Sequence, residues 1–202
     1  DVEDVVPLGV DLGCFHSRDR DRARARLGLP RDVRLALAVG RAQHRKCADL
    51  LAPTVAAAGH DWRLVVAGAG PAPAGAIALG PIDDDSLAWA YNAADAVLFP
   101  SRYEGFGFVT IKALACGVPV VTTPTGWAAT LAERIPGYRP LVVAPQVREL
   151  AAALRRAVDG ELTSAVGAAS ALVRTEHGLR QFRQRWQALA RQVAGPRLRG
   201  SA

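Results

Sequence analysis

Short apolar runs alternate along the chain with longer segments in which apolar residues recur at the spacing of a helix. Six short runs have the length and composition of buried parallel strands, which are apolar on both faces. They fall at residues 34–39, 62–67, 77–79, 96–99, 118–121 and 140–144. Because a helix or a turn follows each run, the pattern predicts an α/β fold with a Rossmann-like, doubly wound parallel sheet.

Helical periodicity or helix boundary signals mark a second set of segments. They fall at residues 17–27, 87–94, 108–116, 128–134, 146–158, 162–174 and 179–193, and a further apolar helix is expected after Lys46. The acids at 83–85 resemble metal ligands, but we favour an N-cap and first-turn cluster for the helix that follows. For the arginines of segment 17–27 we favour a solvated face.

The stretch from Leu98 to Val121 carries the strongest chemical signal in the chain. A strand ends at Pro100, and a loop containing Glu104 and the residues Gly105 to Gly107 leads directly into a helix. Glycines let the backbone pass close to a ligand, and the free N–H groups of a helix start attract an anion. The stretch therefore predicts a binding site for a phosphate or another anionic group.

A second phosphate-site pattern lies between Gly40 and Leu51, where a strand ends in glycine and basic residues precede a helix. Arg41 and Lys46 are its candidate cations, whereas an ordinary surface pair is the simpler alternative. We assign no role to His44 and Arg45. The turn that begins at Gly68 is a weaker signal, since glycines at the carboxyl end of a strand line ligand sites in open α/β sheets.

Composition narrows the picture to a soluble globular domain of 202 residues, of which 50% are apolar and 22% are charged. The three cysteines form no CxxC pair, which favours a reduced, cytoplasmic setting. The net charge of +6 suits an anionic ligand, the inner membrane surface or simply solvated arginines. The chain contains no Met, so we expect it to be part of a longer protein.

These motifs resemble the donor-binding signature of retaining GT-B glycosyltransferases, in particular family four, the glycosyl transferases group 1. That signature is a glutamate, seven residues and a second glutamate. Glu104 supplies the first acid in the family's EGFG context, but position 112 holds Lys112. Arg41 and Lys46 match the family's basic pair, and Cys47 stands where the family usually has glycine.

The resemblance implies the C-terminal, nucleotide-sugar-binding half of a retaining, metal-independent glycosyltransferase. It implies a catalytic role for Glu104, which would accept hydrogen bonds from sugar hydroxyls, and for Arg41 and Lys46, which would hold the leaving diphosphate. No cofactor and no metal are expected, because the nucleotide sugar is the substrate. The resemblance also implies a set of donor-binding residues: Gly40, Gly68, Gly80, Ile82, Gly105, Phe106, Gly107, Phe108, Val109 and Lys112.

The same resemblance suggests an organisation into a hinge at residues 1–11, the binding domain at 12–195 and a flexible tail at 196–202. The partner would be an N-terminal acceptor domain outside this chain, without which we expect no transfer activity. No nucleic-acid partner is expected. The arginines of segment 179–193 predict a solvated face, and peripheral contact with membrane lipid is the alternative.

Lys112 is the clear departure from the family pattern, because an ammonium cannot accept a hydrogen bond from a ribose hydroxyl. Its spacing from Glu104 predicts that both side chains face one cleft, where Lys112 could reach a phosphate. The substitution also favours a second hypothesis, a nucleotide-binding or regulatory module that no longer transfers sugar. A third and weaker hypothesis is an epimerase or phosphorylase of the same architecture.

Overall fold

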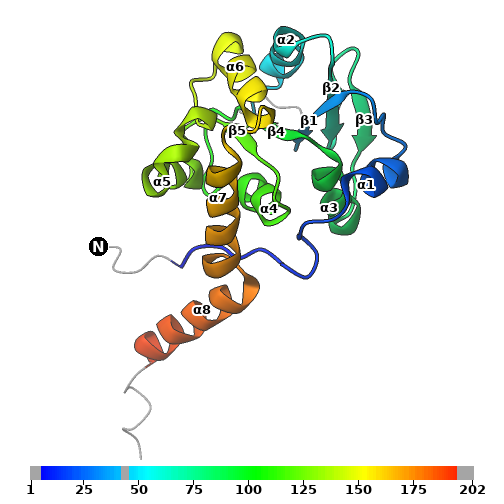
Figure 1. Cartoon of the computed structure of the whole chain (residues 1–202). Helices are drawn as coiled ribbons and strands as arrows, with labels where there is room; N and C mark the ends of the chain where they lie inside the picture. The colour runs from blue at the N-terminus through cyan, green and yellow to red at the C-terminus, as the bar shows by residue number, and fades with distance from the viewer. Residues whose placement is uncertain (1–5, 42–45, 195–202) are drawn as a thin grey trace, which may run out of the picture.

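The computed structural model describes residues 6–41 and 46–194, and its centre is a parallel sheet (Figure 1). The five strands lie in the order β3-β2-β1-β4-β5, and every neighbouring pair is parallel. Their bounds are β1 Arg34–Val39, β2 Trp62–Ala67, β3 Ile77–Gly80, β4 Ala96–Phe99 and β5 Val120–Thr122. The predicted α/β class and the Rossmann-like sheet are therefore confirmed.

The sixth predicted strand, at residues 140–144, is wrong. Pro136–Leu141 instead forms a 3-10 helix, η2. Pro140 has no N–H to give to a ladder, and the N–H of Val142 is used by the carbonyl of Arg139 inside the turn. What remains of the expected pairing is one isolated bridge between Val142 and Thr122.

Helices cover both faces of the sheet, as the doubly wound prediction requires. In Figure 1, α2 and α6 lie on one face, and α1, α3 and α4 lie on the other. The helices are α1 Arg20–Leu27, α2 Ala48–Ala58, α3 Asp84–Ala93, α4 Phe108–Ala115, α5 Trp127–Arg134, α6 Val147–Val158, α7 Thr163–Glu176 and α8 Leu179–Ala194. Within the described ranges, no helix is long and apolar enough to span a bilayer.

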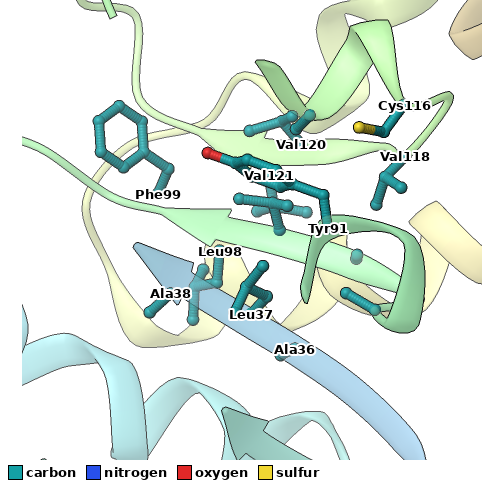
Figure 2. Close-up of a cluster of buried hydrophobic side chains, with 14 of the residues drawn as sticks. Ala36, Leu37, Ala38, Tyr91, Leu98, Phe99, Cys116, Val118, Val120 and Val121 are labelled. Carbon is teal, nitrogen blue, oxygen red and sulfur yellow. The ribbon is translucent and has the colours of Figure 1, made fainter. Parts of the chain in front are cut away.

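The hydrophobic core is built on β1 and β4, which are neighbours in the middle of the sheet. All four residues of β4 are buried, because helices cover the strand on both faces. Figure 2 shows side chains of β1, β4 and β5 together with Tyr91 of α3 and Cys116 at the end of α4. This packing fixes the carboxyl ends of the strands, where the candidate site lies.

The solvated face predicted for the arginines of segment 17–27 is wrong for Arg24, which is buried. Its guanidinium donates to Asp95 at 2.6 Å and to the carbonyl of Ala93 at 2.9 Å. Asp95 in turn accepts the N–H of Leu35 at 2.7 Å. Arg24 therefore joins α1 to the loop before β4, which the charge pattern of the segment alone did not indicate.

The acids at 83–85 act as the helix-start cluster that the sequence predicted. Asp83 is the N-cap of α3 and accepts the N–H of Ser86 at 2.8 Å. This hydrogen bond holds the pKa of Asp83 below its usual value. Asp84 pairs with Lys112, and Asp85 pairs with Arg18 and Arg26.

Candidate functional site

Three of the predicted glycines meet at the carboxyl edge of the sheet. Gly40 follows β1 and donates to the carbonyl of Ala67, while Gly68 follows β2 and donates to the carbonyl of Gly80, each at 2.9 Å. Gly68 has a φ of 152°, and a Cβ there would lie 2.1 Å from the carbonyl oxygen of Gly40. Only glycine fits this contact, so the sequence permits the three turns to close against one another.

A pocket opens beside these turns, between the ends of β1, β2 and β4. Its lining includes Gly40, Arg41, Lys46, Pro71 and Phe99. The two predicted cations therefore border the same space, and Arg41 is exposed. His44 and Arg45, to which we assign no role, lie outside the described residues.

Lys46 and Glu104, which are 58 positions apart, form an ion pair at this edge. The Lys46 Nζ donates to a carboxylate oxygen of Glu104 and lies 4.5 Å from the centroid of the Phe99 ring. Both side chains are mostly shielded, at 19% and 10% exposure. A charged pair in such a position is held in a fixed geometry and responds strongly to an arriving anion.

The loop after Glu104 leads directly into α4, as the sequence predicted. Gly107 is the N-cap of α4, with a φ of 96°. The first N–H groups of α4, beginning at Phe108, have no partner inside the helix and carry the positive end of its dipole. Phe106 packs edge-to-face on Phe108 at 5.7 Å between ring centroids, while Gly105 is exposed.

The remaining predicted contacts, Ile82 and Val109, are partly buried against the core. Ile82 follows the turn at Gly80, and Val109 lies in the first turn of α4. Both residues have apolar side chains, so they offer only backbone polar groups at the edge of the sheet.

The structure does not bring Lys112 to Glu104, contrary to the prediction that they face one cleft. The Lys112 Nζ lies 2.8 Å from the Asp84 carboxylate and 4.3 Å from the centroid of the Phe15 ring. Lys112 lies more than a turn inside α4, and its side chain is directed to the start of α3. Glu104 instead pairs with Lys46, which comes from the opposite side of the loop.

Cys47 has a φ of 50°, the one positive φ outside glycine among the described residues. It is the N-cap of α2, and its side chain is buried, which raises the pKa of the thiol. A left-handed backbone is the conformation that glycine adopts without cost. This observation gives a physical reason for the glycine that the resembled family usually has here.

The sequence did not indicate the residues that pack against the glycine loop, which is formed by residues 105–108. A Cβ on Gly126 would lie 2.7 Å from the carbonyl oxygen of Phe106, and the Trp127 N–H donates to that oxygen at 2.8 Å. The ring of His177 lies under both aromatic residues, with centroids 5.7 Å from Phe106 and 4.8 Å from Trp127. The helix predicted at residues 128–134 begins just after Trp127, whereas no local pattern marked His177.

The sheet order, the facing glycine turns and the Lys46–Glu104 pair describe an α/β domain in which the predicted site residues gather at the carboxyl ends of the strands. The model of the family described as glycosyl transferases group 1 matches residues 33–159. The chain belongs to this family.

A curated relative, D-inositol 3-phosphate glycosyltransferase of Segniliparus rotundus, is 41% identical over 143 residues. The match covers 61% of this chain and 32% of the relative, so the chain spans about a third of that protein. Among solved structures, sucrose-phosphate synthase from Thermosynechococcus elongatus has a TM-score of 0.82 at 28% identity, covering 94% of this chain and 52% of that one.

Two further structures share the fold at lower identity. HepE of Anabaena, in complex with UDP and glucose, has a TM-score of 0.79 at 18% identity, with 96% of this chain and 57% of that one covered. The C-terminal domain of the group 1 glycosyl transferase LpcC from Francisella tularensis has a TM-score of 0.68 at 22% identity. That domain is covered in full, along with 85% of this chain, so the fold is that of the C-terminal half of the GT-B architecture.

Proposed function

We propose that this chain is the donor-binding domain of a glycosyltransferase that transfers a sugar from a nucleotide diphosphate with retention and without a metal. The observation that carries the proposal is the Lys46–Glu104 pair at the carboxyl edge of the sheet, beside the free start of α4. Membership of the family and the UDP complex of HepE support the choice of ligand.

The diphosphate would have two kinds of partner in this arrangement. Arg41 and Lys46, which line the pocket, would supply cations, and the N–H groups of Phe106, Gly107 and Phe108 at the start of α4 would supply neutral donors. These groups would stabilise the negative charge that develops on the diphosphate as it leaves. Glu104, which accepts only when ionised, would receive hydrogen bonds from sugar hydroxyls.

The nucleoside would lie toward β3. Gly80 ends that strand and Ile82 follows it, and both offer mainly backbone groups, so we expect them to contact the base without side chains that would select one base over another. The acceptor and the remaining catalytic groups would come from a second, N-terminal domain, and this chain alone is then inactive in transfer. D-inositol 3-phosphate is the first acceptor to try, because the relative at 41% identity bears that name.

The proposal is tested by calorimetry with UDP, ADP and GDP on the wild type and on Arg41→Ala/Lys46→Ala. Each charge-assisted hydrogen bond contributes about 1.5 kcal/mol or more, so the double variant should bind about 100-fold more weakly. The matched control is Arg155→Ala/Arg156→Ala, which removes two exposed cations of α6 that do not line the pocket. Equal affinity in both double variants would contradict the assignment.

A second candidate function is a module that binds the nucleotide without transferring sugar. It is favoured by Lys112, which stands where the family has its second acid and is engaged with Asp84. The two candidates differ in one measurement on the two-domain protein. The enzyme consumes a nucleotide sugar when an acceptor is present, whereas the binding module holds it unchanged.

A further inference from the structure

His177 contacts three separate parts of the molecule at once. It is the C-cap of α7 and is 3% exposed. Its Nδ1 lies 3.3 Å from the carbonyl oxygen of Leu8, and its ring packs on Phe106 and Trp127. A carbonyl can only accept, so the bond to Leu8 assigns the proton of the neutral ring to Nδ1.

The N-terminal segment at residues 8–10 is tied to the same residue through the backbone. The Val10 N–H donates to the carbonyl of His177 at 2.7 Å, and the Leu179 N–H donates to the carbonyl of Val10 at 3.0 Å. Val10 and Gly178 form a parallel bridge between this segment and the corner of α7 and α8. The segment therefore cannot shift along the corner without moving His177.

The opposite side of the ring supports the loop proposed to hold the diphosphate. The carbonyl of Phe106 accepts the Trp127 N–H and lies close to Gly126, and the ring of Phe106 packs on the ring of His177. An open cavity of about 760 Å³, lined in part by Phe106, Trp127 and His177, adjoins these rings. The same cavity is also lined by Leu8, so it borders both the N-terminal segment and the rings.

We propose that His177 is a positioning residue that couples the position of segment 8–10 to the conformation of the Gly105–Phe108 loop. The inference rests on the proposed function, because it assigns the loop to nucleotide diphosphate binding. His177 would act through its packing on Phe106 and would not itself contact the nucleotide sugar. A domain attached through segment 8–10 would thereby influence the donor site over a chain of direct contacts.

The coupling is reciprocal, so a ligand at the loop must also affect the segment. The experiment measures amide hydrogen exchange by NMR on the whole chain, with and without UDP. In the wild type, UDP should slow exchange at the loop amides and should also slow exchange at the Val10 amide by about fivefold or more. A residue with a merely structural role would leave the Val10 amide unaffected by UDP.

Variants separate the two contacts of the ring. His177→Phe keeps an aromatic ring against Phe106 but loses the bond to Leu8, so it should bind UDP while the effect on Val10 disappears. His177→Ala removes both contacts and should also weaken UDP binding. Tyr138→Phe is the control, because it removes the two buried hydrogen bonds between the Tyr138 hydroxyl and the backbone of Val120 in β5. Its Val10 amide should respond to UDP as in the wild type.

The wild-type measurement alone decides the matter, even if a variant does not fold. UDP binding with unchanged exchange at Val10 would overturn the coupling and leave the proposed function standing. A wild type that binds no UDP would overturn the proposed function and the coupling together.

Discussion

Tyr91 and Tyr138 are equally buried in the core but differ in the hydrogen bonding of their hydroxyl groups. Tyr138 donates to the Val120 carbonyl at 3.2 Å and accepts its N–H at 2.9 Å. The Tyr91 hydroxyl has no hydrogen-bond partner among the residues that the structure describes. Burial raises the pKa of both phenols, so both are neutral at physiological pH.

We expect Tyr91→Phe and Tyr138→Phe to change stability in opposite directions. An unpaired buried polar group costs free energy, whereas a satisfied one contributes it. Tyr91→Phe should raise the free energy of unfolding by about 1 kcal/mol, and Tyr138→Phe should lower it by about the same amount. Urea denaturation measures both, and a loss of stability in both variants would contradict the role of the hydroxyl groups.

Lys112 now has a different expected behaviour from the one its motif position suggested. Lys112→Glu restores the family's acid but places it opposite Asp84, so like charges replace an ion pair. We expect the variant to lose about 0.5 kcal/mol of stability, since Asp84 is well exposed. Adding Asp84→Lys should recover the lost stability, because it restores an ion pair with the charges exchanged. A double-mutant cycle measures the coupling energy between positions 84 and 112, and a control cycle of Lys112→Glu with Asp85→Asn should show no coupling energy.

The site residues that could be predicted are those whose chemistry is local in sequence. Gly107 and Glu104 lie in one loop and lead into one helix, so a short pattern carries their geometry. The partner of Lys112 and the position of His177 depend on helices packed from distant parts of the chain. No local spacing encodes such contacts, which is why the sequence missed them.

At the level of elements, the strands whose bounds were predicted to the residue are 34–39, 62–67 and 96–99. The run at 96–99 is buried throughout and uninterrupted, whereas the runs at 34–39 and 62–67 are mostly buried and each contains one exposed arginine, Arg34 or Arg63. The run at 140–144 is also apolar, but Pro140 has no N–H and the Val142 N–H is used in a turn, so the pairing with β5 is limited to the bridge at Thr122, whose carbonyl accepts the Val143 N–H at 2.8 Å. Hydrophobicity predicts burial there, while backbone donors decide whether a strand forms.

The junction between α1 and β4 depends on one buried ion pair. Arg24 is 3% exposed and satisfies Asp95 together with three backbone carbonyls. We expect Arg24→Ala to lower the free energy of unfolding by about 3 kcal/mol, because it leaves a buried carboxylate and unpaired carbonyls.

Arg20→Ala is the matched control for that variant. Arg20 binds the same carboxylate at 2.6 Å, but its own side chain is 58% exposed. Its removal should cost less than about 1 kcal/mol. Thermal or urea unfolding that gives equal losses in the two variants would show that burial does not decide the strength of this pair.

On the scale of the whole molecule, the N-terminal segment of the described chain meets the corner of α7 and α8. Segment 8–10 pairs there with residues 177–179, and α8 extends away from the sheet (Figure 1). His177 lies between this corner and the glycine loop. The fold thus places the proposed donor site and the terminal segments within a few contacts of each other.

This position also makes His177 a source of pH dependence in the stability of the domain. Burial lowers its pKa below the usual 6.5. The charged groups around it are Glu176, Arg134 and Arg185, and the carboxylate of Glu176 is held by Arg134 at 2.6 Å. Desolvation by burial is the largest of these influences, so the ring is neutral in the folded state at physiological pH.

The sign of the effect follows from proton binding. Below pH 6.5 the unfolded chain protonates this histidine while the folded chain does not, so stability falls as the pH decreases. The loss has a limiting slope of about 1.4 kcal/mol per pH unit and ends at the folded-state pKa. Glu176, whose pKa is lowered by Arg134, adds its own loss only below about 4.5, in a separate window.

We therefore expect urea unfolding to show that the wild type loses stability as the pH falls below 6.5 and that His177→Phe loses less. The other histidines are common to both proteins, so their effect cancels in the difference between the two curves. A difference that stays constant across this range would mean that His177 titrates normally when folded. Since a normal titration requires contact with water, it would also contradict the packing of the ring beneath Phe106 and Trp127.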